Sequence, residues 1–316
     1  MFMCSGRPTG AGAHPSTILQ TFRLPEPVKG ELELRFRPTG KEKADTAAVE
    51  NTVSEIIMPK SYLAEYVQYL GNAVPKDTLN VLCVGNSFTY YWGCPAMLKE
   101  IAWNEGHYLR VKSTLKGGQT LGDHLALPVS RNVVNAGRYD FAFFQDQSQS
   151  PARYASDTTQ FDYVNTNFLK LTDRLLSRSR NCRVILESTW SFEKDDFGGF
   201  GSHAAFDSLM TIGTSMMVRN ASKIFGANDF EVSPIGRAFS IVRNENPGID
   251  LYSADSKHQS DYGSYLKACV NYLMIFRKPF QSQPADGATS SIDCGIPHDK
   301  AAYLRQVAER VVLGSR

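Results

Sequence analysis

Short apolar runs alternate with longer amphipathic segments from about residue 80 to the end of the chain. Continuous apolar runs of this length are typical of strands buried on both faces of a sheet, whereas apolar positions spaced three and four apart indicate helices. We predict strands at 81–84, 109–113, 140–145, 183–187 and 230–235. We predict helices at about 95–105, 161–179, 203–225, 261–276 and 299–312. This alternation predicts an α/β fold with a parallel sheet covered by helices on both faces.

The N-terminal part of the chain follows a different pattern. Proline and glycine recur through residues 1–40, which disfavours long helices there. Strict alternation of polar and apolar residues at 31–37 predicts a half-buried strand, and residues 43–70 predict two helical pieces separated by a proline. We therefore divide the chain into an N-terminal extension, residues 1–75, and an α/β domain, residues 76–316.

Composition and charge narrow the functional class. The 316 residues include 34 Lys and Arg and 32 Asp and Glu, for a formal net charge of +2. This near balance argues against a strongly basic nucleic-acid-binding protein. The apolar fraction of 42% and the charged fraction of 21% are ordinary for a folded chain. No apolar run approaches the roughly 20 residues that a membrane-spanning helix needs.

The cysteines and the first residues bear on the compartment. The six cysteines form no CxxC pair, so neither a zinc ribbon nor a thioredoxin-like site is indicated. Cys83, Cys182 and Cys269 lie in apolar segments and are expected to be buried as small hydrophobic residues. The opening Met-Phe-Met-Cys-Ser-Gly lacks the basic and apolar regions of a signal peptide. Two compartments stay open: outside the cytoplasm, secreted or lipid-anchored, if Cys4 is the remnant of a lipoprotein signal, and the cytoplasm otherwise.

Two polar motifs after predicted strands suggest nucleophilic chemistry, because active residues of parallel α/β sheets gather at the carboxyl ends of the strands. Gly85-Asn86-Ser87 places a serine in a turn after a buried strand. We expect its hydroxyl to be exposed there, with nearby backbone N–H groups positioned to face an oxyanion. Asp255 lies three residues before His258, so its carboxylate can hold the imidazole in one tautomer. The alternatives are a plain turn serine, and a surface salt bridge in a loop that ends at the helix cap Ser260.

Two further motifs follow the second and third predicted strands. Gly118 lies in the segment 116–120, where a glycine lets a backbone N–H approach a ligand closely. The spacing GxxxxGK[ST] is absent, so this segment is not a phosphate loop. Gln145 ends the third strand, from which its amide can donate a hydrogen bond into the same pocket. A flexible turn and an ordinary strand-end polar residue are the respective alternatives.

In this order the four motifs resemble the blocks of the SGNH (GDSL-type) hydrolase superfamily. Gly85-Asn86-Ser87 looks like a variant, found in a bacterial subgroup, of the usual Gly-Asp-Ser block. Asp255 and His258 match the Asp-x-x-His block. The third block normally carries an asparagine in GxND; that sequence is missing here, and Gln145 is the nearest match, with Gln147 second. The resemblance covers about residues 80–276.

The resemblance implies a three-layer α/β/α sandwich with a five-stranded parallel, flavodoxin-like sheet, and ester hydrolysis through an acyl-enzyme. Ser87 would attack the carbonyl carbon, His258 would take and return the proton, and Asp255 would orient His258. The backbone N–H groups of Ser87 and Gly118, with the Gln145 amide, would form the oxyanion hole. No cofactor and no metal are implied.

The substrate is less defined by the sequence. Trp190, beside a predicted strand end, and Gln147 are candidates for substrate contact. Many members of the superfamily remove acetyl groups from carbohydrates, so the resemblance favours a carbohydrate O-acetylesterase acting on a small-molecule or carbohydrate ester. The alternative function is a catalytically inactive SGNH-fold protein that binds carbohydrates or a partner. The oligomeric state stays open.

Two other enzyme classes agree less well with the sequence. An α/β-hydrolase has a GxSxG elbow, whereas the second residue after Ser87 is Thr89, and its acid and histidine usually come from separate loops. A zinc enzyme usually has an HExxH or another close ligand pair, but His107, His124 and His203 are scattered. We expect these three to be surface or partly buried histidines.

Overall fold

The computed structural model describes residues 77–194, 198–226, 230–281 and 291–314. Residues 77–316 form one compact unit. The predicted strand at 31–37 and the helical pieces at 43–70 lie outside the described residues. The division of the chain into 1–75 and 76–316 therefore stays a prediction.

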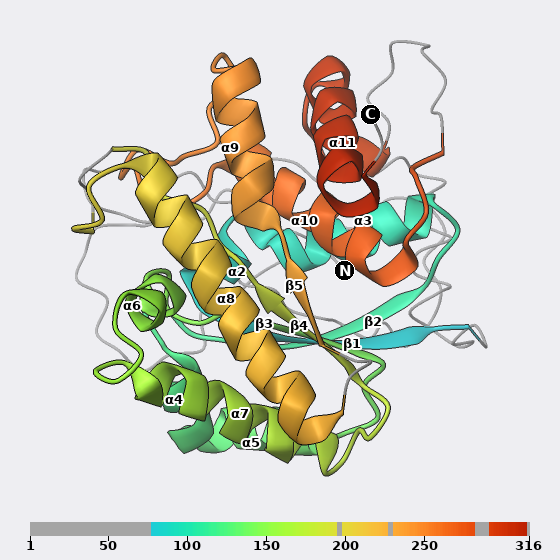
Figure 1. Cartoon of the computed structure of the whole chain (residues 1–316). Helices are drawn as coiled ribbons and strands as arrows, with labels where there is room; N and C mark the ends of the chain where they lie inside the picture. The colour runs from blue at the N-terminus through green and yellow to red at the C-terminus, as the bar shows by residue number, and fades with distance from the viewer. Residues whose placement is uncertain (1–76, 195–197, 227–229, 282–290, 315–316) are drawn as a thin grey trace, which may run out of the picture. The chain divides into compact units, whose positions relative to one another are not determined.

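Five strands form one parallel sheet in the order β2-β1-β3-β4-β5 (Figure 1). All five predicted strands are confirmed, with ends within two residues of the predicted ones. They are β1 (Leu79–Gly85), β2 (Leu109–Leu115), β3 (Phe141–Phe144), β4 (Arg183–Glu187) and β5 (Phe230–Ser233).

The five predicted helices are also confirmed. They are α3 (Cys94–Asn104), α7 (Asp162–Leu176), α8 (His203–Phe225), α10 (Asp261–Phe276) and α11 (His298–Leu313). Ser260 caps α10 as expected, accepting a hydrogen bond from Gly263 N at 3.2 Å.

The prediction missed five helices, α2 (Ser87–Tyr90), α4 (Leu121–Ala126), α5 (Pro128–Asn135), α6 (Ser150–Ser156) and α9 (Ile235–Glu245). The first four have too few turns for a helical period to stand out. In α9 the period is visible, since Ile235, Ala238, Phe239 and Val242 form its buried face. The predicted strand end at 235 hid the beginning of this helix.

Helices cover both faces of the sheet, as the α/β prediction requires (Figure 1). The strands are buried on both sides: Val81 and Cys83 of β1 belong to the core with α3, α9, α10 and α11, whereas Leu82 and Val84 belong to the core with α4, α5 and α7. Helix α8 contributes to both cores. A central strand buried on two faces explains why β1 has a continuous apolar sequence instead of an alternating one.

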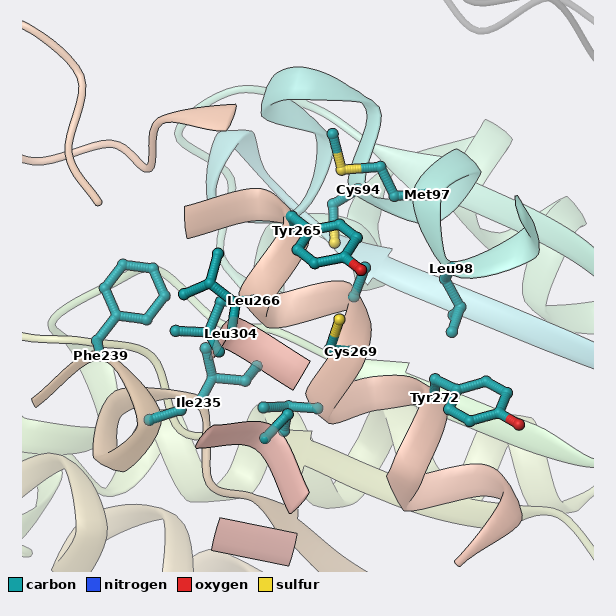
Figure 2. Close-up of a cluster of buried hydrophobic side chains, with 14 of the residues drawn as sticks. Cys94, Met97, Leu98, Ile235, Phe239, Tyr265, Leu266, Cys269, Tyr272 and Leu304 are labelled. Atoms are coloured by element: carbon teal, nitrogen blue, oxygen red, sulfur yellow. The ribbon is translucent and has the colours of Figure 1, made fainter. Parts of the chain in front are cut away.

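The first of these cores is densely filled around α10. Figure 2 shows side chains of α10 together with Cys94, Met97 and Leu98 of α3. Helix α10 is buried along nearly its whole length. Cys83, Cys182 and Cys269 are buried, as expected from their apolar surroundings in the sequence. None of the helices in the described part of the chain is long and apolar enough to cross a membrane.

The strand order places a topological switch between β1 and β3. From β1 the chain passes to β2 on one side of the sheet and then crosses to β3 on the other side. In open α/β sheets, ligands bind beyond the carboxyl ends of the strands at such a switch point. Ser87 and Gln145 lie within two residues of the ends of β1 and β3, so the fold points to these strand ends as the candidate site.

Candidate active site

Ser87 occupies the first position of α2, directly after β1 and the capping residue Asn86. The Asn86 side chain accepts a hydrogen bond from Phe88 N at 3.1 Å and donates one to the Gln119 carbonyl at 2.9 Å. It thus caps the helix and joins it to the loop after β2. The N–H of Ser87 is among the first amides of α2, which have no acceptor within the helix.

Gln145 supports this turn instead of facing the pocket, contrary to our expectation. Its Oε1 accepts hydrogen bonds from Asn86 N at 2.9 Å and Thr89 Oγ1 at 3.1 Å, and its Nε2 donates to the Asp146 carbonyl. The side chain is fully buried. The buried amide of Asn86 requires an acceptor, and Gln145 supplies it. A β-carbon at Gly85 would lie 2.8 Å from Gln145 Oε1, so this position needs glycine.

The structure brings Ser87, Asp255 and His258 together in one hydrogen-bonded row. His258 Nε2 lies 2.7 Å from Ser87 Oγ, across 171 positions of sequence. His258 Nδ1 lies 2.5 Å from Asp255 Oδ2. A carboxylate that accepts from Nδ1–H leaves Nε2 with a lone pair directed at the serine hydroxyl. The row therefore has the geometry of a nucleophile, a general base and an orienting acid.

Asp255 is held in the charged form that this arrangement needs. Its Oδ1 accepts hydrogen bonds from the backbone amides of Lys257, at 3.1 Å, and His258, at 2.9 Å. Burial by itself raises the pKa of Asp255, but the hydrogen bonds from the His258 ring and from these two amides outweigh it, so the pKa lies below its usual value. A charged Asp255 stabilises the imidazolium form of His258.

Three hydrogen bonds hold the loop of His258 in place. Gln259 Nε2 donates to the Ser87 carbonyl at 3.1 Å, and Glu193 N donates to the Ser256 carbonyl at 2.9 Å. Trp190 Nε1 donates to the Lys257 carbonyl at 3.1 Å. These bonds join the loop to α2 and to the segment after β4, so the imidazole and the hydroxyl are fixed relative to one another.

Trp190 does not line a pocket, which corrects our expectation of substrate contact. The side chain is 0% exposed and stacks between Phe88, at a ring distance of 4.8 Å, and Phe239, at 4.2 Å. Its apolar ring fills the core beneath the site, and its one polar atom finds a backbone acceptor in the loop of His258. The expectation failed because a position after a strand does not determine which way the side chain points.

An aromatic ring lies flat against His258. The ring of Tyr91 stacks on the imidazole with centroids 4.3 Å apart and an interplanar angle of 17°. Trp92 and Gly93 then adopt left-handed backbone conformations, with φ of 54° and 68°, which end the short α2 segment and begin α3. Tyr91 is buried, so the stack restricts the rotation of the imidazole away from Ser87.

Gly118 and Gln147 lie in the loops that follow β2 and β3. Gly118 is exposed, with φ of 72°, in a turn closed by a 3.3 Å hydrogen bond from Gln119 N to the Lys116 carbonyl. Gln147 is half-buried, and its side chain accepts from Gln149 N at 2.9 Å. The loop of Gly118 is joined to the nucleophile turn through Gln119, whereas Gln147 follows β3. Their roles toward an oxyanion and a substrate remain proposals.

Two buried titratable groups, Asp146 and His124, lie beside the site. We predicted no role for either from the sequence, and our expectation that His124 lies at the surface or partly buried was wrong, since the residue is 1% exposed. Asp146 Oδ1 accepts from the amides of Leu121, at 3.0 Å, and Gln147, at 2.7 Å, and burial raises its pKa to about 6 against these bonds. His124 Nε2 lies 2.9 Å from the Gly85 carbonyl, and burial lowers the pKa of this imidazole. The sequence offers one signal for each: Asp146 follows a strand, and His124 lies on a short helix.

His107 and His203 are partly buried, as expected, and lie in ordinary packing environments. His107 stacks on Phe276 with ring centroids 4.0 Å apart, and His203 Nδ1 lies 3.2 Å from Ser191 Oγ. Within residues 77–194, 198–226, 230–281 and 291–314, no three His, Cys, Asp or Glu side chains are grouped so that they can hold a metal ion.

Comparison with known proteins finds similar structures but no similar sequence. No protein-family model matches the chain, and no curated protein matches its sequence. The structure is similar to that of a DUF4886 family protein from Bacteroides uniformis, with a TM-score of 0.54 and 17% sequence identity over 75% of this chain and 95% of that one. At this identity the likeness shows a shared fold.

Two other similar structures carry the names of hydrolases. One is Axe2, an acetylxylan esterase from Geobacillus stearothermophilus, with a TM-score of 0.48 and 13% identity over 66% of this chain and 100% of that one. The other is a lipase/acylhydrolase from Enterococcus faecalis, with a TM-score of 0.46 and 14% identity over 65% and 100%. In this chain, Ser87 lies at the switch point between β1 and β3 of the parallel sheet.

Proposed function

We propose that the protein is a serine esterase that hydrolyses carboxylic esters through an acyl-enzyme. One observation carries this proposal: His258 Nε2 lies 2.7 Å from Ser87 Oγ while the opposite ring nitrogen contacts Asp255. Acyl transfer requires a nucleophile, a base next to it, and an acid that orients the base, and the three side chains lie in this order. The site lies at the carboxyl ends of parallel strands, where ligands of open α/β sheets bind.

In the first half of the reaction, Ser87 Oγ forms a bond to the ester carbonyl carbon as its proton passes to His258 Nε2. The tetrahedral intermediate then collapses, the bond to the leaving oxygen breaks, and His258 returns the proton to the departing alcohol. In the second half, water adds to the acyl carbon as one of its protons passes to His258 Nε2. The bond between the acyl carbon and Ser87 Oγ then breaks, His258 returns the proton to Oγ, and the acid is released. Asp255 stabilises the imidazolium in both halves.

Backbone amides supply the oxyanion hole in this proposal. The N–H groups of Ser87 and Gly118 are the two donors, and removing one such donor typically costs on the order of 3 kcal/mol in the activation free energy. Because the hydrogen bonds of Gln145 run to the nucleophile turn, Gln147 is the better candidate for a third, side-chain donor. A Gln147→Ala change tests this assignment without disturbing the turn.

A carbohydrate O-acetyl ester is the substrate class that we propose from the resemblance to SGNH hydrolases. Release of acetate from acetylated xylan or acetylated sugars would support it, and activity restricted to long-chain acyl esters would refute it. A catalytically inactive binding protein is the alternative function. The intact row of Ser87, His258 and Asp255 favours the enzyme, because a site without chemistry has no need of this geometry.

The direct test compares the wild type with Ser87→Ala on p-nitrophenyl acetate. We expect clear turnover by the wild type and a loss of at least ~1000-fold in kcat/KM for the variant, since only the oxyanion hole and binding remain. Both proteins should have the same thermal unfolding midpoint, because the change removes one small, nearly buried hydroxyl. Equal rates for the two proteins would remove Ser87 as the nucleophile.

A further inference from the structure

A lysine lies fully buried directly beneath the nucleophile turn. Lys267 is the single charged residue in the apolar stretch 262–276 of α10, and its side chain is 0% exposed. Its Nζ donates to the Phe88 carbonyl at 2.9 Å, to Thr89 Oγ1 at 3.2 Å and to Glu187 Oε2 at 2.6 Å. An ammonium group has three donors, and all three are used.

The partner of this lysine is buried and satisfied as well. Glu187, the last residue of β4, is 2% exposed, and its second oxygen accepts from Asn271 Nδ2 at 2.7 Å. Asn271 in turn accepts from Ser233 Oγ at 2.9 Å. Apolar residues of similar volume usually stabilise a core as well as a buried ion pair does, or better. Stability alone therefore does not account for two charges at this position.

The contacts of Lys267 lead to the nucleophile from two directions. Phe88 and Thr89 are the two residues after Ser87, and Thr89 Oγ1 passes the network on to Gln145, which holds the amide of Asn86. The same helix, α10, begins directly after the loop that carries His258. Lys267 thus connects α2, which carries the hydroxyl, to α10, the helix that follows the imidazole.

We propose that Lys267 is a positioning residue for Ser87, and that Glu187 keeps its ammonium group in place. The inference rests on the proposed esterase function. The ammonium anchors α2 through the Phe88 carbonyl and the Thr89 hydroxyl, and so maintains the separation between Ser87 Oγ and His258 Nε2. Misplacing a reacting group by about 1 Å can cost on the order of 100-fold in rate, so such an anchor has kinetic value beyond its effect on stability.

The test separates positioning from stability by removing both charges together. Lys267→Met alone leaves Glu187 buried without its partner, so we expect that variant to unfold at a much lower temperature. The double variant Lys267→Met/Glu187→Gln has no buried charge, and the amide oxygen that replaces the carboxylate still accepts from Asn271. We expect its unfolding midpoint to return close to that of the wild type. Its rate of labelling by diisopropyl fluorophosphate, which reports the reactivity of Ser87, should be about 10- to 100-fold lower.

Steady-state kinetics provide a second readout on the same double variant. With p-nitrophenyl acetate we expect kcat to fall in parallel with labelling and KM to stay within about threefold, because an anchor beneath α2 does not touch the substrate. A purely structural role predicts that labelling and kcat recover together with stability. Labelling of the folded double variant within about twofold of the wild type would overturn the proposal.

A second buried pair provides the matched control. Arg305 Nη1 lies 2.5 Å from Asp293 Oδ1, both side chains are buried, and among the described residues neither side chain forms a hydrogen bond with α2. The double variant Arg305→Met/Asp293→Asn should label at the wild-type rate. Equal slowing in both double variants would assign the effect to general loss of core packing and would overturn a specific role for Lys267.

One more variant keeps the inference testable if the Lys267 double variant does not fold. Thr89→Val preserves shape and both charges but removes the hydroxyl between Lys267 and Gln145. We expect labelling about 3- to 10-fold slower, and an unchanged rate overturns the proposal. If wild type and Ser87→Ala behave alike toward both reagents, the esterase function fails and the positioning role fails with it. If the wild type is active and the Lys267 and Thr89 variants are labelled at the wild-type rate, the positioning role of Lys267 is rejected and the esterase function stands.

Discussion

Two imidazoles flank the nucleophile turn, and they differ in partner and in access. The ring of His258 faces the Ser87 hydroxyl, has a carboxylate behind it, and is 15% exposed. The ring of His124 faces the Gly85 carbonyl, has the Ser130 hydroxyl behind it at 2.8 Å, and is almost fully buried. Each ring contacts a residue at the end of β1 or in the turn that follows it.

The difference shows that closeness to a nucleophile does not make a histidine a base. A carbonyl only accepts, so the Nε2 of His124 carries the hydrogen and has no lone pair to offer. Burial lowers the pKa of His124, which keeps the ring neutral. His258 instead has a charged acid that stabilises its protonated form and a ring nitrogen directed at a hydroxyl. We therefore expect substitution of His258 to lower the reaction rate and substitution of His124 to lower the stability.

The largest expected effect is that of His258→Gln. Without a base at this position, kcat on p-nitrophenyl acetate should fall by about 10⁴-fold or more, as when the triad histidine of a serine hydrolase is lost. The measurement is initial-rate kinetics together with thermal unfolding, which should show a folded protein. A folded variant that keeps more than about a tenth of the activity would contradict the role of His258.

Asp255→Asn should have the next largest effect. An amide that donates toward Nδ1 selects the wrong tautomer and no longer stabilises the imidazolium, so we expect about a 1000-fold loss in kcat. Steady-state kinetics measure it, and Asp261→Asn, at the first turn of α10 near the same loop, serves as the control with activity close to wild type. A similar loss in both variants would show that loop structure, and not the tautomer, was affected.

The pH profile should report His258 and leave His124 silent. Asp255 stays ionised from pH 5 to 8, because its pKa lies below its usual value. The rate constant kcat/KM should therefore fall about tenfold per pH unit on the acid side of a single midpoint, where His258 gains a proton. Rate measurements across pH 5–8 test this. A flat profile would count against His258 as the base.

His124→Gln should have the smallest effect on rate and a clear effect on stability. We expect kcat within about fivefold of the wild type, and a loss of about 1–3 kcal/mol in the free energy of unfolding from the buried hydrogen bonds. The folded-state pKa of His124 is lowered, so the stability that this residue contributes is present above the unfolded pKa of about 6.5 and is lost as the pH falls below it. Denaturant unfolding at pH 8 and pH 5 should show the larger difference between the proteins at pH 8.

A reversed pH trend, with the larger difference at pH 5, would contradict this account of His124. A loss of activity comparable to that of His258→Gln, in a folded protein, would mean that the two imidazoles are not functionally distinct. Either result would break the contrast from which these expectations are drawn.

Much of the architecture was predictable because it depends on local pattern. The strands β1 to β5 and the five longer predicted helices follow from apolar spacing, and the motifs around Ser87, Gly118 and Gln145 follow strands as expected. Asp255 lies in the loop before α10, also as expected. The spacing of α9 was also present in the sequence, although it was not recognised. The contact between Ser87 and His258 was expected from the resemblance to the SGNH hydrolases, and the two side chains lie within hydrogen-bond distance of one another.

Side-chain direction and pairing, by contrast, were decided only by tertiary structure. Sequence gives Gln145 and Trp190 a position after a strand, but the buried amide of Asn86 and the gap between two aromatic rings determine where these side chains go. Lys267 is visible in sequence as a lone charge in an apolar helix, yet its partner is 80 positions away. A hydrogen bond between distant residues leaves no local period, so only the packed fold shows which polar groups satisfy one another.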